Sequence, residues 1–257
     1  MRFIHYSIDD VIVGFQELTL NNPKTIFDIK LFNFLKHLHD QCGVKVSCYC
    51  FFKNDTFNIS LCTRMYKSEF EANSSWLRFG FHGYTGKEDY NQQPLETSIK
   101  QYEETITNLI DIVGLKSIDT IPRIHTFSGS KEFLNFLGCN SILSIKGLLA
   151  ADDERVSYSL SKQEDKKLKL ENCLLEENFL LMRTFQRFDG IKPNKIIRLF
   201  RHKGGVVLFT HEWLLNNPIG MKNKFKGIVV KKLMFVVANY YKKKGYQSAF
   251  PMDLKIL

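Results

Sequence analysis

The chain has 257 residues, 44% of them hydrophobic and 25% charged, which is typical of a soluble globular protein and excludes a disordered chain. Its net charge of +9 favours anionic partners such as phosphorylated glycans, nucleotide sugars, nucleic acid or a membrane surface, although solvated Lys-rich faces would give the same value. No apolar run reaches the ~18 residues of a membrane-spanning helix, and no cleavable signal peptide follows Met1. We therefore expect a cytoplasmic protein with a single domain over residues 1–257.

Strands and helices alternate along the chain. Apolar and β-branched runs predict strands over residues 3–8, 44–52, 76–81, 120–127, 141–149, 178–188, 205–210 and 246–250. Apolar residues at helical spacing predict helices over residues 25–42, 67–73, 94–113, 131–137, 194–202 and 227–244. This alternation predicts an α/β fold with a mostly parallel sheet, either open or closed into a barrel.

The six cysteines lie at positions 42, 48, 50, 62, 139 and 173, without the paired spacing of a zinc-thiolate site. Cys48 and Cys50 are two residues apart on a predicted strand, so they share a face and are expected to be small core residues. Reduced thiols inside the cell fit this pattern better than a disulfide framework does.

Titratable residues stand at the ends of the predicted strands. Four strands end in or near such residues, namely Asp9, Asp10, His82, Arg123, His125 and His211, and a fifth ends in Asp152-Asp153. Parallel strands place their carboxyl ends on one face, so we expect these side chains to converge. One Asp and two His make a three-ligand set with an open position for water, which is the arrangement of a catalytic zinc-type site.

Several of these stretches resemble motifs of the polysaccharide deacetylases, the NodB-homology superfamily of carbohydrate esterases. Ser7-Ile8-Asp9-Asp10 resembles the first motif, which pairs a base Asp with a metal-binding Asp. Phe79-Gly80-Phe81-His82-Gly83 sits where the metal-histidine motif falls, and Val207-Leu208-Phe209-Thr210-His211 resembles the late Leu-x-His motif. Arg123 falls where an Arg holds the catalytic base. The resemblance implies a deformed (β/α)7-type barrel of about seven strands, with the site at the strand carboxyl ends.

The chain departs from the family pattern at one position. The second motif usually carries another His four residues after the first, and here that position is Gly86. The missing ligand could come from His125, or from Glu88 or Asp89. The sequence therefore resembles a divergent branch of the superfamily.

The resemblance also implies a metal and its ligands. A divalent ion, with Zn²⁺ as the expected one, would be held by Asp10 and His82. We expect His125 as the third ligand, because it shares a strand face with Arg123 two residues away, with Glu88 or Asp89 as the alternatives. Such an ion lowers the pKa of bound water and polarises an amide or ester carbonyl.

The remaining roles in the resemblance concern protons. Asp9 would remove a proton from the attacking water, and Arg123 would keep Asp9 ionised and oriented. His211 would protonate the leaving amine, which requires it to be charged near neutral pH. We therefore expect a metal-dependent hydrolase, namely a deacetylase of an N-acetylated sugar or glycan precursor.

Other polar residues have weaker functional readings. The remaining histidines are expected to be structural or solvated, and these are His5, His37, His39 and His202. A second group could line a substrate pocket or simply form a turn or core contact, and it comprises Asp152, Asp153, Arg155, Tyr158 and Trp213.

Two alternative functions stay open at this point. A catalytically degenerate protein on the same fold would bind a glycan or another anion, and the missing second histidine favours it. Nucleic-acid binding is less favoured, because the chain has no stripe of Lys or Arg interleaved with aromatics and no zinc-finger or helix-turn-helix signature.

Overall fold

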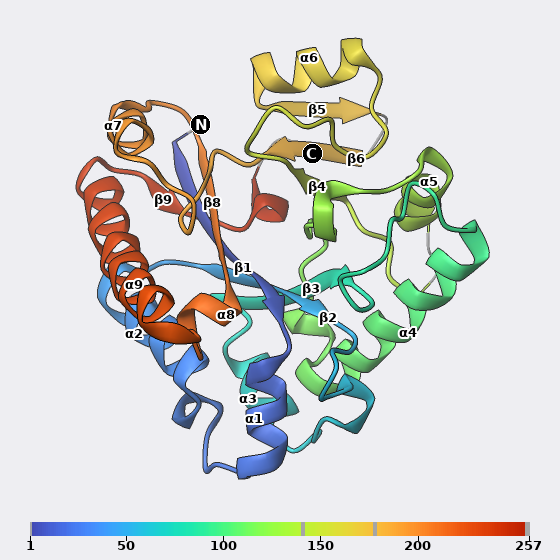
Figure 1. Cartoon of the computed structure of the whole chain (residues 1–257), viewed down its shortest axis with the longest axis vertical. Helices are drawn as coiled ribbons and strands as arrows, with labels where there is room; N and C mark the ends of the chain where they lie inside the picture. Colours follow the sequence, from blue (N-terminus) through green and yellow to red (C-terminus); the bar gives the residue numbers. More distant parts are fainter. Residues whose placement is uncertain (1, 140–141, 177–178, 255–257) are drawn as a thin grey trace.

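The computed structural model describes residues 2–139, 142–176 and 179–254 (Figure 1). Its main sheet is parallel and has the strand order β3-β2-β1-β8-β7, with β9 paired to the start of β1. These strands are β1 (Phe3–Val11), β2 (Val46–Phe51), β3 (Leu77–Gly83), β7 (Gln186–Arg187), β8 (Val206–His211) and β9 (Gln247–Ser248). A smaller sheet, in the order β4-β6-β5, comprises β4 (Gly147–Ala150), β5 (Cys173–Glu176) and β6 (Phe179–Arg183).

Extended segments join the two sheets into a deformed barrel. The backbone N–H of Asp119 donates to a carbonyl of β3 (2.7 Å), and the N–H of Lys146, at the entrance to β4, donates to the carbonyl of Thr120 (2.7 Å). Between β6 and β7, the N–H of Phe185 donates to β8 (2.8 Å). In order around the barrel, its wall is formed by β1, β2, β3, the extended segment 118–123, β4, β6 with β7, and β8. The predicted α/β class and deformed barrel are confirmed.

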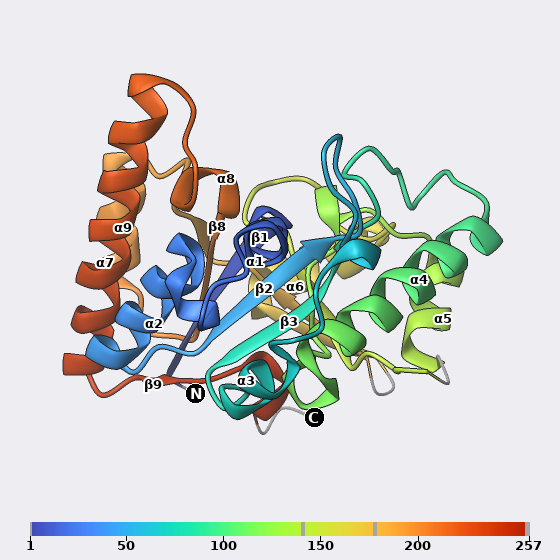
Figure 2. The same ribbon diagram turned by 90° about the horizontal axis from the view of Figure 1, so that it is seen from below.

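Helices cover the outside of the barrel (Figures 1 and 2). They are α1 (Val13–Asn21), α2 (Lys30–Cys42), α3 (Lys67–Ala72), α4 (Leu95–Val113), α5 (Lys131–Cys139), α6 (Lys162–Glu171), α7 (Pro193–Arg201), α8 (Glu212–Leu215) and α9 (Gly220–Lys243). α2 buries Leu31, Leu35 and Leu38 on its inner face and is capped by Gly43, whose left-handed φ of 71° suits glycine. Within the described ranges, no helix is both long enough and apolar enough to cross a membrane.

The aromatic content of the sequence is explained by the space between β2, β3 and the helices. Phe15, Phe32, Phe70 and Phe79 meet there, mostly edge to face, with ring centroids 5.1–6.3 Å apart. Such pairs add about 0.5–1.5 kcal/mol each beyond the apolar area they bury. This cluster packs α1, α2 and α3 against β3.

The first half of the chain follows the predicted elements more closely than the second. β1 runs on to Val11, past the expected stop near Asp9, and α1 was not predicted because its apolar residues lack a clear helical period. The expected helix 25–42 begins with a 3-10 turn (Ile26–Asp28) before α2, and the expected helix 227–244 already begins at Gly220.

Most corrections fall between residues 120 and 190. The predicted strand 120–127 is wrong, since its end forms a 3-10 turn (His125–Phe127) with left-handed Thr126 (φ 56°). Its buried Ile121 and Ile124 gave the apolar pattern of a strand without forming one. The strand 141–149 shrinks to β4, and Thr184 and Phe185 divide the strand 178–188 into β6 and β7. Their expected first residues, 141 and 178, lie outside the described residues.

Candidate functional site

The end of β1 presents Asp9 and Asp10 to different neighbours. Asp9 is 1% exposed and lies opposite His211 in the register of β1 with β8. Asp10 has a left-handed φ of 61°, at the point where the pairing of β1 with β2 shifts register. A non-glycine residue in this conformation costs on the order of 1–3 kcal/mol, and such strain concentrates at functional sites.

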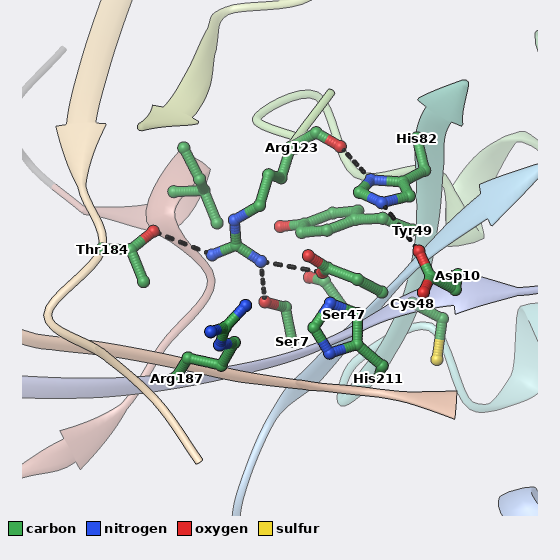
Figure 3. Close-up of polar contacts among 12 residues, drawn as sticks. Ser7, Asp10, Ser47, Cys48, Tyr49, His82, Arg123, Thr184, Arg187 and His211 are labelled. Atoms are coloured by element: carbon green, nitrogen blue, oxygen red, sulfur yellow. Dashed lines mark hydrogen bonds and ion pairs between the residues drawn. The ribbon is translucent and has the colours of Figure 1, made fainter. Parts of the chain in front are cut away.

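The Asp10 carboxylate meets two histidines. The ligand atoms of Asp10, His82 and His125 all lie within 4.8 Å of one another, so these residues could hold a metal ion. Nε2 of His82 is 3.2 Å from Oδ1 of Asp10 (Figure 3). These two atoms and Nδ1 of His125 are buried without a hydrogen-bond partner among the described residues. Since an unpaired buried polar atom costs about 1–3 kcal/mol, the arrangement fits a cation bound by one carboxylate and two imidazoles.

The protonation states in this group also suit a metal. Burial raises the pKa of Asp10, but the contact with His82 and the nearby His211 and His125 outweigh burial, so its pKa is lowered. Burial, followed by the neighbouring His82, lowers the pKa of His125. An ionised carboxylate and a neutral imidazole are the forms that bind a metal near neutral pH.

A hydrogen bond through Nδ1 fixes the orientation of the His82 ring. Its Nδ1 is 2.6 Å from the carbonyl oxygen of Arg123 and donates to it, which leaves Nε2 facing Asp10 and available to a metal (Figure 3). Metal-binding histidines are typically anchored in this way through the second ring nitrogen. The Phe51 ring packs against both His82 and His125, with centroids 4.9 and 5.3 Å away.

The same phenylalanine leaves no room for a histidine at position 86. Gly86 has φ +80°, and a Cβ added there would lie 2.9 Å from Cζ of Phe51. A histidine at position 86 would therefore be strained in its backbone and blocked by a ring. The space next to His82 is filled by Phe51, whose ring also contacts His125.

The two loop carboxylates considered as alternative ligands bind their own loop. Glu88 accepts the backbone N–H groups of Thr85 (2.9 Å) and Gly86 (3.0 Å). Asp89 accepts the N–H of Asn91 (3.0 Å). Among the described residues, only Asp10, His82 and His125 are brought together as a possible metal-binding group.

Arg123 forms a buried network beside this group (Figure 3). One guanidinium nitrogen donates to Oδ1 of Asp9 (2.8 Å) and to Oγ of Ser7 (2.8 Å), and another donates to Oγ1 of Thr184 (2.9 Å). The guanidinium carbon also lies 4.2 Å from the centroid of the Phe209 ring. A buried ion pair with several such hydrogen bonds holds Asp9 as a carboxylate in one orientation.

His211 has a carboxylate partner that sequence reasoning missed. Its Nδ1 lies 3.2 Å from Oδ2 of Asp189, whose other oxygen is 3.8 Å from Nε of Arg187. Burial disfavours the charged imidazole, but Asp189, Asp10 and Asp9 outweigh burial and raise the pKa of His211. Asp189 follows a short strand, so the signal that pointed to Asp9 and Asp10 was available for it too.

Most of the residues considered for a substrate pocket form contacts outside the candidate site. Asp153 pairs with Arg155 at the surface (2.7 Å), Asp152 accepts the backbone N–H of Arg187 (3.1 Å), and buried Tyr158 donates to the carbonyl of Leu149 (2.7 Å). Trp213 is different, since it is 39% exposed and its ring stacks 6.3 Å from that of His211.

A cavity of about 650 Å³ lies elsewhere, between α5, α6 and β6. Tyr158, Leu134 and Leu181 are among its lining residues, whereas the six candidate site residues are not.

The remaining histidines contact other parts of the fold. Nδ1 of His5 bonds the carbonyl of Ala249, and the other contacts are His37 with Phe235, His39 with Trp76 and His202 with Phe185.

Comparisons with known proteins find similarity in structure rather than in sequence. No protein-family model and no curated protein sequence matches this chain. A 4-alpha-glucanotransferase from Thermococcus litoralis is similar over 98% of this chain and 38% of its own, with a TM-score of 0.57 and 11% identity. This similarity establishes a shared fold.

Deacetylases are also among the similar structures. A peptidoglycan N-acetylglucosamine deacetylase matches 97% of this chain and 86% of its own, with a TM-score of 0.49 and 12% identity. A chitin deacetylase from Colletotrichum lindemuthianum matches 90% of this chain and 82% of its own, with a TM-score of 0.44 and 12% identity.

Proposed function

We propose that this protein is a metal-dependent hydrolase that removes the acetyl group from an N-acetylated sugar or glycan precursor. The observation that carries the proposal is the set of buried ligand atoms on Asp10, His82 and His125, which have no hydrogen-bond partner in the part of the chain that the structure describes. Beside them, the buried Arg123–Asp9 pair supplies an oriented carboxylate. The names of the similar glycan deacetylases support the substrate class.

Asp10, His82 and His125 would hold a divalent metal, and we propose Zn²⁺, which favours nitrogen ligands together with a carboxylate. When bound there, the ion would lower the pKa of a water and polarise the amide carbonyl. Phe51 closes one side of the group and restricts the positions that the two imidazoles can take.

The other residues of the site would handle protons. Asp9 accepts a proton as water adds to the carbonyl carbon, while Arg123 keeps its carboxylate ionised and fixed. His211, held through Nδ1 by Asp189, donates a proton from Nε2 to the nitrogen as the C–N bond breaks. The products are acetate and a free amine, and the raised pKa of His211 keeps the donor charged at the start.

A catalytically degenerate binding protein is the second candidate. It is favoured by Gly86 in place of the second histidine of the family motif. In that case the group around Asp10 would hold an ion or a glycan without turnover. We also propose a cytoplasmic location, which the six free cysteines support.

The test is acetate release from a panel of N-acetylated sugars, measured together with the metal content of the same protein. We expect acetate from the wild type, and from Asp9→Asn a normal metal content with turnover reduced ~10²–10⁴-fold. Asp153→Asn is the matched control, since Asp153 pairs with Arg155 at the surface. If the protein binds metal but hydrolyses no sugar of the panel, the hydrolase proposal is wrong and the binding-protein candidate replaces it.

A further inference from the structure

The positive charge of the chain is concentrated in one stretch that contains α7, β8, α8 and α9. Residues 191–246 hold thirteen Lys and Arg against one acid, a net charge of +12, whereas the rest of the chain carries −3. That acid, Glu212, is fully buried and accepts the backbone N–H groups at the start of α1 (2.7–2.8 Å). The exposed part of this stretch therefore carries cations without acids.

Within this stretch, α9 directs apolar side chains outward as well as inward. Its inner face buries Val230, Met234 and Val237. Five residues on the opposite side are 45–88% exposed and form what we call the α9 strip, namely Met221, Phe225, Ile228, Val229 and Val236. Single exposed apolar residues are ordinary, but these recur at spacings of three, four and seven and so share one helix face. An outward face of this kind is unusual for a surface helix.

Lysines flank the α9 strip. Lys222 and Lys226 are four residues apart and form a row along one edge, while Lys224 and Lys231 are seven apart and lie along the other. Lys232 lies within the strip, between Val229 and Val236. The face is thus apolar along its centre and cationic along both edges.

This combination favours one occupant. A second copy would bring two cationic faces together, and an anionic polymer would use the lysines but leave the apolar centre exposed. An anionic bilayer satisfies both, because apolar side chains enter the acyl boundary while lysines reach the headgroups. We propose that the α9 strip and its lysines dock this protein on an anionic lipid bilayer, with α9 lying on the surface.

The docking face lies next to the candidate site. α8 directly follows His211 and leads into α9, whose first turns project beyond α8 (Figure 2). Nζ of Lys226 lies 5.9 Å from the centre of the Trp213 ring, which itself stacks 6.3 Å from His211. Bilayer-bound protein would have its site near the membrane. If the proposed function holds, a sugar carried at the membrane would be within reach, whereas docking itself does not depend on that function.

The test is flotation of the whole protein with vesicles of phosphatidylcholine alone or mixed equally with phosphatidylglycerol. We expect flotation only with the mixed vesicles, weakened by salt, and a blue shift of tryptophan fluorescence because Trp213 is exposed while Trp76 is buried. Replacing Lys222, Lys224 and Lys226 by Gln should weaken binding about 5-fold for each lysine lost. The double substitution Met221→Ser with Phe225→Ser leaves the charge unchanged and should weaken binding at least ~10-fold.

Controls come from α6, which also exposes lysines and an apolar residue. Leu170→Ser, at a position 78% exposed, and the triple replacement of Lys162, Lys166 and Lys167 by Gln should leave flotation unchanged. Circular dichroism checks that each variant folds. Absence of flotation overturns the proposal. A wild-type protein that is a dimer and a serine variant that is a monomer would also overturn it. So would a serine variant that binds polyphosphate and vesicles as strongly as the wild type does.

Discussion

Two neighbouring parts of the site differ in whether their buried polar atoms have hydrogen-bond partners. Around Arg123, the guanidinium donates to Asp9, Ser7 and Thr184 at 2.8–2.9 Å. In the group of Asp10, His82 and His125, one carboxylate oxygen and one nitrogen of each imidazole are buried without a hydrogen-bond partner among the described residues. Both parts are enclosed by the same barrel, so burial alone does not account for the difference.

The contrast separates a positioning network from a binding group. The Arg123 network is nearly complete within the protein, so it stabilises one orientation of Asp9. The Asp10 group is left incomplete, and its two histidines and carboxylate are the donors that a divalent cation takes. Substitutions in the binding group should therefore act on metal content, and substitutions in the network on turnover and stability.

The largest effect is expected from His82→Ala. Loss of this ligand should remove the metal and reduce acetate release at least ~10³-fold, because metal polarisation of a carbonyl is worth several kcal/mol. His125→Ala should also lower metal occupancy. Glu88→Gln is the matched control, because Glu88 bonds its own loop and should leave metal content unchanged. Metal lost in Glu88→Gln but kept in His125→Ala would reverse the ligand assignment.

Arg123→Met should act on stability rather than on metal content. It leaves Asp9 buried without its cation and should lower the free energy of unfolding by about 3–5 kcal/mol, as measured by urea denaturation. Adding Asp9→Asn removes the stranded charge and should restore part of that loss. Equal instability of the single and double variants would show that Arg123 acts through packing alone.

Asp189→Asn should shift the pH dependence of turnover. In the proposed function His211 is the acid, so the rate should fall as pH rises through its pKa, which Asp189 helps to raise. Without Asp189 the pKa drops, and the fall should begin at lower pH, with up to ~10-fold less activity for each pH unit above it. An alkaline limb that stays in place would exclude His211 as the proton donor.

The smallest effect is expected at Gly86. Gly86→Ala places a Cβ at φ +80° and 2.9 Å from Phe51, so it should cost about 1–3 kcal/mol of stability, measured by thermal unfolding. Gly86→His should be no better and should not raise metal affinity. A tighter metal site in Gly86→His would mean that Phe51 yields and that the family pattern can be restored.

The sequence was a good guide where a motif stands at the end of a real strand. Asp9 and Asp10 on β1, His82 on β3 and His211 on β8 were located correctly, because a buried apolar run ending in a polar residue determines both strand and face. The left-handed turn at Asp10 could not be foreseen, since no glycine marks it.

The sequence was a poorer guide from residue 120 to residue 190. Ile121 and Ile124 give the apolar pattern of a strand because they are buried, although this segment is not a strand. An apolar pattern reflects burial and does not show how the backbone is hydrogen-bonded. Asp189 lies within range of His211 only because β7 pairs with β8, a contact between segments whose pairing the sequence does not specify. The single-domain assignment over 1–257 and the roles of the site residues stay predictions.

The central claim is that Asp10, His82 and His125 hold a divalent metal, and anomalous X-ray diffraction tests it most directly. Data collected on either side of the zinc absorption edge, from crystals grown with Zn²⁺, would locate the ion. The account predicts one strong peak about 2.0–2.2 Å from Nε2 of His82, from a ring nitrogen of His125 and from a carboxylate oxygen of Asp10. A peak at Glu88 or Asp89, or none near His82, would contradict it.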